Sequence, residues 1–81
     1  MKSRWLLRAL RANQQPKLSQ RQLAQRVATR LNRSFSEPRY WQIENGYGNP
    51  ASQDERAAIA AELNVKPSAI DWPALEGARA S

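Results

Sequence analysis

The sequence predicts an all-α protein, a compact bundle of five short helices. Apolar residues recur three and four positions apart, and a serine stands just before three of the apolar segments. No segment alternates apolar and polar residues as a half-buried strand would. With 81 residues the chain is large enough for one small core. We therefore expect one domain over residues 1–73, followed by a short flexible tail at 74–81.

The first helix is expected over residues 2–13. Leu7 and Leu10 lie three positions apart among arginines, which is typical of an amphipathic helix. Trp5 and Leu6 are expected to extend its buried stripe. The Gln-Gln-Pro segment that follows ends the helix, because proline has no amide hydrogen to donate.

The second helix is predicted to begin after Ser19 and to reach Asn32. Ser19 can cap the helix, and Gln22, three residues later, can complete a capping box. The apolar residues of this helix recur at four-residue steps and line one face: Leu23, Val27 and Leu31.

A third helix is predicted between Ser36 and Gly46. Ser36 is a suitable cap, and Pro38 stands in the first turn, where a missing amide hydrogen costs little. Phe35 and Tyr40 have the spacing of a hydrophobic staple. Gly46 ends the helix, because glycine readily adopts the left-handed conformation of a helix stop.

Two further helices complete the expected bundle. Ser52 and Glu55 form a second capping box, which opens an alanine-rich helix with Ile59 and Leu63 on its inner face. Residues 67–72 predict a final short helix, with a proline at its start and another proline to halt it.

The basic residues are concentrated in the first part of the chain. The whole chain has 13 Lys and Arg against 7 Asp and Glu. Residues 1–46 hold ten basic and two acidic side chains, whereas residues 47–81 hold three and five. DNA would be attracted to the basic part, because Lys and Arg placed against phosphates release counterions. An ordinary solvated surface fits the same charges, so charge alone does not decide.

Composition argues against several classes of function. The chain has no Cys and no His, which excludes disulfides, thiolate or imidazole metal ligands, and catalytic triads with an imidazole base. We expect no metal, no cofactor and no enzymatic activity. Asp54 and Glu55, the only adjacent carboxylates, suit the positive end of a helix. No apolar run is long enough to span a membrane, and we expect a cytoplasmic protein.

Two blocks of sequence resemble a known DNA-binding motif. They are Leu18-Ser19-Gln20-Arg21-Gln22-Leu23-Ala24 and Ile43-Glu44-Asn45-Gly46, the second followed by Asn49-Pro50. Together they resemble the helix-turn-helix of the lambda-repressor-like family, which includes the Cro/CI and XRE-type regulators. The resemblance covers about residues 5–72. It implies a sequence-specific regulator of double-stranded DNA, a repressor of phage or mobile-element type that binds a palindromic operator as a homodimer.

The resemblance also implies a set of DNA contacts. On the third helix, the residues expected to contact base edges are Glu37, Pro38 and Gln42, with Arg39 reaching a guanine or a phosphate. The residues expected to contact phosphates are Ser19 and Gln20 at the start of the second helix and Asn45 at the end of the third, with Lys17, Arg21 and Arg11 as backbone neighbours. Solvation of the surface explains these last three equally well.

Trp41 is unusual because it falls on the predicted outward face of the third helix. A large aromatic side chain is uncommon there unless something covers it. It can contact bases by packing on a thymine methyl group or a sugar, or it can form a dimer contact. In the alternative interpretation the helix is rotated and Trp41 closes the core.

The sequence departs from the family between the two helices of the motif. The connection is longer than usual, and Ala28 stands where the family has the glycine of its tight turn. We therefore expect a lengthened second helix, followed by a wider turn at residues 33–34.

Two other functions remain open. One is an antitoxin-like protein-interaction module that also regulates its own promoter, with Trp41 and the apolar residues at 74–75 as its contact surface. The other is nonspecific or RNA binding, for which equal affinity for unrelated sequences is the signature.

Overall fold

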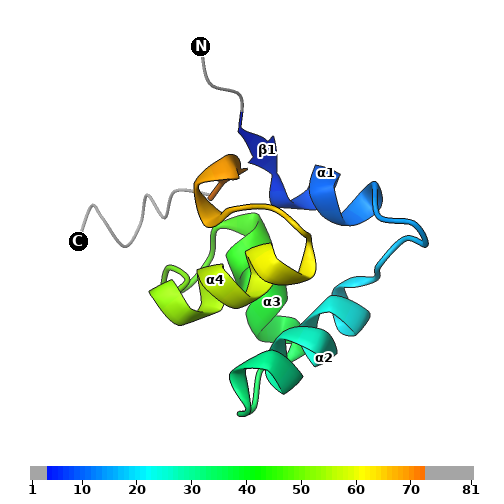
Figure 1. Cartoon of the computed structure of the whole chain (residues 1–81). Helices are drawn as coiled ribbons and strands as arrows, with labels where there is room; N and C mark the ends of the chain where they lie inside the picture. The colour runs from blue at the N-terminus through cyan, green and yellow to red at the C-terminus, as the bar shows by residue number, and fades with distance from the viewer. Residues whose placement is uncertain (1–3, 73–81) are drawn as a thin grey trace.

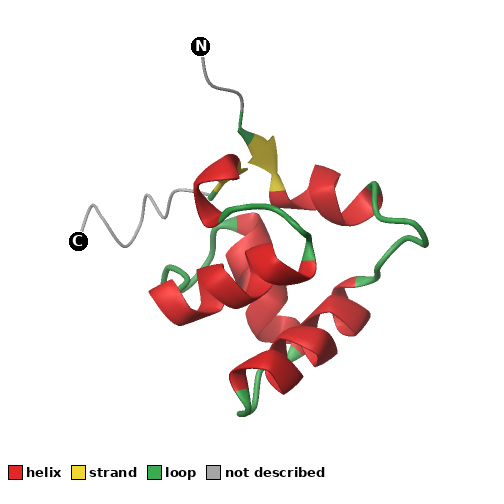
Figure 2. Cartoon of the chain, in the orientation of Figure 1, coloured by secondary structure: helices red, strands yellow, loops and turns green. Residues whose placement is uncertain are grey.

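Four α-helices pack around one core in residues 4–72, the part of the chain that the computed structural model describes (Figures 1 and 2). The mostly helical fold class is confirmed, but there are four helices rather than the expected five. The elements in chain order are β1 (Trp5–Leu6), α1 (Leu7–Ala12), α2 (Gln20–Leu31), α3 (Glu37–Asn45), α4 (Gln53–Glu62), a 3₁₀ turn η1 (Pro67–Ala69) and β2 (Ile70–Asp71).

The three predicted serine caps are confirmed. The Ser19 hydroxyl accepts a hydrogen bond from the Gln22 backbone N–H, and Gln22 accepts one in return from the Ser19 backbone. Ser52 and Glu55 form the same reciprocal box at the start of α4, and Ser36 caps α3. These bonds satisfy amide groups that the first turn of a helix leaves without partners.

The ends of α2 and α3 also agree with the sequence. As expected for a position occupied by alanine, α2 continues through Ala28 and stops at Asn32, which is left-handed with φ 57°. The chain leaves α3 through Gly46 at φ 78°. Glycine adopts this conformation without the steric cost that a side chain brings.

The predictions for the first and the last helix of the bundle were wrong. α1 begins only at Leu7, and Trp5 and Leu6 form a short strand whose side chains are exposed rather than buried. The expected fifth helix is one 3₁₀ turn followed by β2, which pairs in parallel with β1 so that Trp5 lies opposite Ile70. A short helix is costly to nucleate, and β-branched Ile70 gains more by pairing and filling the core. The predicted tail at 74–81 lies outside the described residues.

The core lies where the four helices and η1 meet. α2 packs against both α3 and α4, and η1 packs against α4. The buried apolar residues of the core are Leu7, Leu18, Leu23, Ala24, Val27, Phe35, Tyr40, Ile43, Ala58, Ile59, Ala60, Leu63 and Ile70. The two short strands lie at the opposite end of the molecule from α2 (Figure 1). Within residues 4–72, no helix is both long and apolar enough to cross a bilayer.

Candidate nucleic-acid interface

The outward face of α3 carries most of the residues predicted to contact bases. Tyr40 and Ile43 are buried as expected, whereas Glu37, Pro38 and Trp41 are exposed. A helix advances about 100° per residue, so the three exposed side chains lie on the side away from the core. These three side chains are therefore accessible from outside the molecule.

Gln42 lies at the edge of this face, half-buried against the turn that follows α3. A Cβ atom added at Gly48 would come within 3.2 Å of the Gln42 Oε1 atom, so the carboxamide packs directly over this glycine. Gly48 is left-handed, with φ 71°. The Gln42 side chain makes no hydrogen bond within residues 4–72, which leaves its amide available for a base.

The expectation for Arg39 requires a correction. Its guanidinium turns away from the outward face and binds Glu55, with Nε 3.1 Å from Oε2 and Nη2 2.7 Å from Oε1. It also donates to the backbone carbonyls of Asn49 and Pro50. The acidic first turn of α4 attracts the guanidinium, and a planar guanidinium matches a carboxylate with two bonds. Arg39 therefore links α3 to α4, and its guanidinium is not free to reach a guanine or a phosphate.

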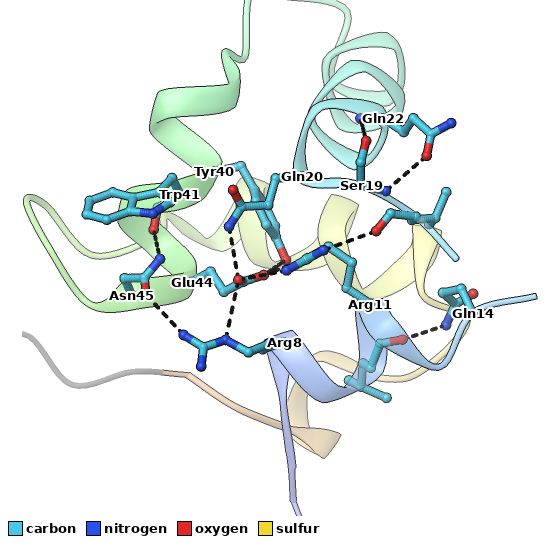
Figure 3. A network of polar contacts seen from close by, with 12 residues as sticks. Arg8, Arg11, Gln14, Ser19, Gln20, Gln22, Tyr40, Trp41, Glu44 and Asn45 are labelled. Carbon is cyan, nitrogen blue, oxygen red and sulfur yellow. Dashed lines mark hydrogen bonds and ion pairs between the residues drawn. The ribbon is translucent and has the colours of Figure 1, made fainter. Parts of the chain in front are cut away.

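A polar cluster behind the interface is centred on Glu44, which is only 7% exposed (Figure 3). Arg11 donates from Nε to Oε1 at 2.9 Å and from Nη2 to Oε2 at 3.0 Å. The Tyr40 hydroxyl donates to Oε1 at 2.8 Å, and Gln20 Nε2 donates to Oε2 at 3.0 Å. The Nε atom of Arg8 lies 3.9 Å from Oε2. Glu44 of α3 is thereby paired with Arg11 of α1, and the pair is largely buried.

The electrostatics of this cluster keep Glu44 ionised. Burial alone would raise the pKa of Glu44, but hydrogen bonds from Arg11 and Tyr40 outweigh it and hold the pKa below its usual range. Burial, reinforced by the negative charge of Glu44, raises the pKa of Tyr40, which therefore stays a hydrogen-bond donor at neutral pH. The hydrogen bond with Glu44 raises the pKa of Arg11.

We expect the protein to lose stability when the pH falls below about 4.3, the ordinary pKa of a glutamate. The folded state lowers the pKa of both Glu44 and Glu55, in the second case because the bonds from Arg39 and Ser52 outweigh burial. Such groups stabilise the folded protein above their unfolded pKa, and this stabilisation is lost as the pH falls through the folded pKa. The urea concentration at half-unfolding, measured between pH 7 and pH 3, should decrease as the pH goes below about 4.3. A midpoint that stays constant would contradict the assigned ion pairs.

The residues predicted to contact phosphate are divided between free and occupied groups. Lys17 and Arg21 are exposed, and neither forms an ion pair within residues 4–72. The Ser19 hydroxyl is exposed but already accepts the Gln22 amide. Gln20 uses one N–H of its carboxamide on Glu44, and a carboxamide nitrogen carries a second.

Two other residues predicted to contact phosphate are engaged in hydrogen bonds within the protein. Arg11 is committed to Glu44 and to the Leu18 carbonyl, so it is a structural residue rather than a backbone neighbour. Asn45 donates from Nδ2 to the Trp41 carbonyl and accepts from Arg8 Nη2 at 3.2 Å. Arg8, whose side chain is 69% exposed, was not among the predicted contacts, although it stands with the basic residues of the first helix.

The aromatic side chain of Trp41 is exposed, which excludes the alternative in which it closes the core. It is 45% exposed and stacks on Tyr47, with ring centroids 5.3 Å apart and planes within 1° of parallel. Tyr47 is 60% exposed and was missed by the sequence analysis. Helical spacing gave no signal for Tyr47, because it follows the helix and is brought over Trp41 by the left-handed Gly46.

Among residues 4–72, no three acidic side chains are grouped closely enough to hold a metal ion. The candidate interface is a surface of exposed helix side chains, cations and aromatic rings. No family model matches the chain, and neither a curated protein nor a solved structure is similar enough to match it.

Proposed function

We propose that the chain is a sequence-specific regulator that binds double-stranded DNA, with α3 in the major groove and the start of α2 against the phosphate backbone. The observation that supports this most strongly is the hydrogen bond between Gln20 and Glu44, which joins the first residue of α2 to α3. The outward residues of α3 and the exposed cations beside α2 are thereby held in a fixed relation. Pairing of backbone anchors with a base-contacting helix is what helix-turn-helix recognition needs.

The start of α2 has free groups suited to a phosphate. Within residues 4–72 the backbone N–H groups of Gln20 and Arg21 make no hydrogen bond, whereas that of Gln22 is used by the Ser19 cap. Free amides and the positive end of the helix dipole favour an anion there. Lys17 and Arg21 add two charges without local partners. Contacts of this kind fix position and affinity rather than sequence.

The base contacts fall to Glu37, Pro38, Trp41 and Gln42. The Gln42 carboxamide suits the paired donor and acceptor of adenine, and Glu37 can accept a hydrogen bond from the cytosine amino group. A single module of this size covers only about 600–1,000 Å² of protein surface on DNA. A homodimer on a palindrome, with half-sites about one helical turn apart, would supply the missing affinity. Bound across a promoter, it would repress by blocking polymerase.

The proposal is tested by selecting bound fragments from random duplex DNA and measuring the mass of the complex. We expect Gln42→Ala to relax base preference at one position in each half-site, at a cost of about 1–3 kcal/mol against the preferred base. Gln20→Ala should weaken binding to all sequences, because it removes a backbone contact and a bond to Glu44. Circular dichroism of each variant controls for folding.

Equal losses from both substitutions on every sequence would contradict the assignment of α3 to the groove. Equal affinity of the unaltered protein for unrelated duplexes, or for RNA, would contradict sequence-specific binding altogether.

A further inference from the structure

Trp41 and Tyr47 form a stacked pair, here called the aromatic pair, whose rings are both exposed at the end of α3. Trp41 belongs to α3, and the backbone N–H of Tyr47 donates to the Gln42 carbonyl at 2.8 Å. The two rings are nearly parallel, with centroids 5.3 Å apart. The backbone bond fixes the position of Tyr47 relative to α3, and stacking restricts the two rings, so binding costs less conformational entropy than it would for two unstacked rings.

The surroundings of the aromatic pair favour a nucleic acid as its partner. Trp41 shares the exposed face of α3 with Glu37 and Pro38. Its carbonyl is linked through Asn45 to the exposed guanidinium of Arg8 (Figure 3). Trp41 itself belongs to residues 1–46, which hold ten basic and two acidic side chains. Positive charge around an exposed apolar surface complements the phosphates that border a groove.

In the major groove, the 5-methyl group of thymine is the apolar group that the face of an aromatic ring can contact. The groove edges of adenine, guanine and cytosine present hydrogen-bond donors and acceptors, whereas thymine also presents a 5-methyl group. An aromatic face set against the polar edges would take water from them without returning a hydrogen bond, which is costly. Set against a methyl group, it buries apolar surface on both sides.

From this geometry we propose that the aromatic pair contacts the 5-methyl group of a thymine in each half-site and so selects thymine at that position. This inference rests on the proposed function, since it needs α3 in the major groove. It adds Tyr47 to the residues that determine specificity, and it gives the unusual exposed Trp41 a chemical target.

The test compares thymine with deoxyuridine, which lacks only the methyl group. Each thymine of the selected duplex is replaced in turn by deoxyuridine, and affinity is measured by fluorescence anisotropy. We expect about a fourfold loss at one position in each half-site, the value of burying one carbon of this kind. Equal binding of all substituted duplexes would overturn the methyl contact while leaving DNA binding intact. Failure to select any duplex would instead overturn the proposed function, and the methyl contact with it.

Matched variants identify the residues responsible. Trp41→Ala and Tyr47→Ala should each abolish the difference between thymine and deoxyuridine, and neither opens the core because both rings are exposed. Trp5→Ala is the control, since it removes an exposed tryptophan from β1. It should keep the difference. A difference that persists in Trp41→Ala, or a loss of dimer mass rather than of thymine preference, would overturn the proposal.

Discussion

Replacing Glu44 by alanine is expected to lower the free energy of unfolding by about 3–5 kcal/mol. Glu44 is nearly fully buried and accepts hydrogen bonds from Arg11, Tyr40 and Gln20. Its removal would leave the Tyr40 hydroxyl without an acceptor and would leave the Arg11 guanidinium with only the Leu18 carbonyl, in a region of low solvent access. The total free energy of unfolding of a small domain is only about 5–15 kcal/mol, so this loss would leave the folded state only marginally stable.

The control is Glu62→Ala, which breaks the ion pair between Arg30 and Glu62 on a more exposed surface. The side chains of this pair are 48% and 16% exposed, against 2% for Glu44, and a pair near the surface contributes about 1 kcal/mol or less, so this variant should unfold at nearly the normal urea concentration. Glu44→Gln should fall between the two, because a carboxamide can still accept from Tyr40 but carries no charge. A Glu44→Ala variant as stable as Glu62→Ala would show that the buried cluster contributes little.

The starts of α2, α3 and α4 and the end of α3 were predictable because each depends on a few adjacent residues. Ser19 with Gln22 and Ser52 with Glu55 need only a three-residue spacing to form their boxes, and Gly46 needs only its own freedom of conformation. The structure agrees with all of these. The outward placement of Trp41 was likewise predictable from the 100° advance of α3.

What could not be predicted depends on contacts between distant parts of the chain. Glu55 was assigned a local capping role, which it has, but its second partner, Arg39, is 16 residues away on another helix. The pairing of Trp5 with Ile70 joins the two ends of the described chain, and neither strand is long enough to show alternation. The local pattern of α3 does not show that Glu55 of α4 lies within reach of Arg39. For this reason Arg39 was expected to contact DNA.

Reversing two charges at the start of α2 should have the largest effect on DNA binding. Lys17→Glu combined with Arg21→Glu should weaken binding by about 50- to 100-fold at 0.1 M salt, on preferred and random sequences alike. A plot of log affinity against log salt concentration has a negative slope, with a magnitude of about 0.9 for each phosphate that the protein neutralises. Loss of two such contacts should therefore reduce the magnitude of the slope by about two. Anisotropy titrations over a range of salt concentrations measure both quantities. Neither side chain is buried, so the fold should persist.

The matched control makes the same change in net charge elsewhere. Arg4→Glu combined with Lys66→Glu alters exposed cations near the β1 and η1 end, away from α2 (Figure 1). If the start of α2 is the phosphate anchor, this control should change affinity only slightly and leave the salt slope nearly intact. Long-range attraction alone would weaken both double variants to a similar extent, because it depends on total charge. Equal losses in the two would therefore contradict a defined anchor at α2, whereas a loss confined to the α2 variant requires cations placed directly against the backbone.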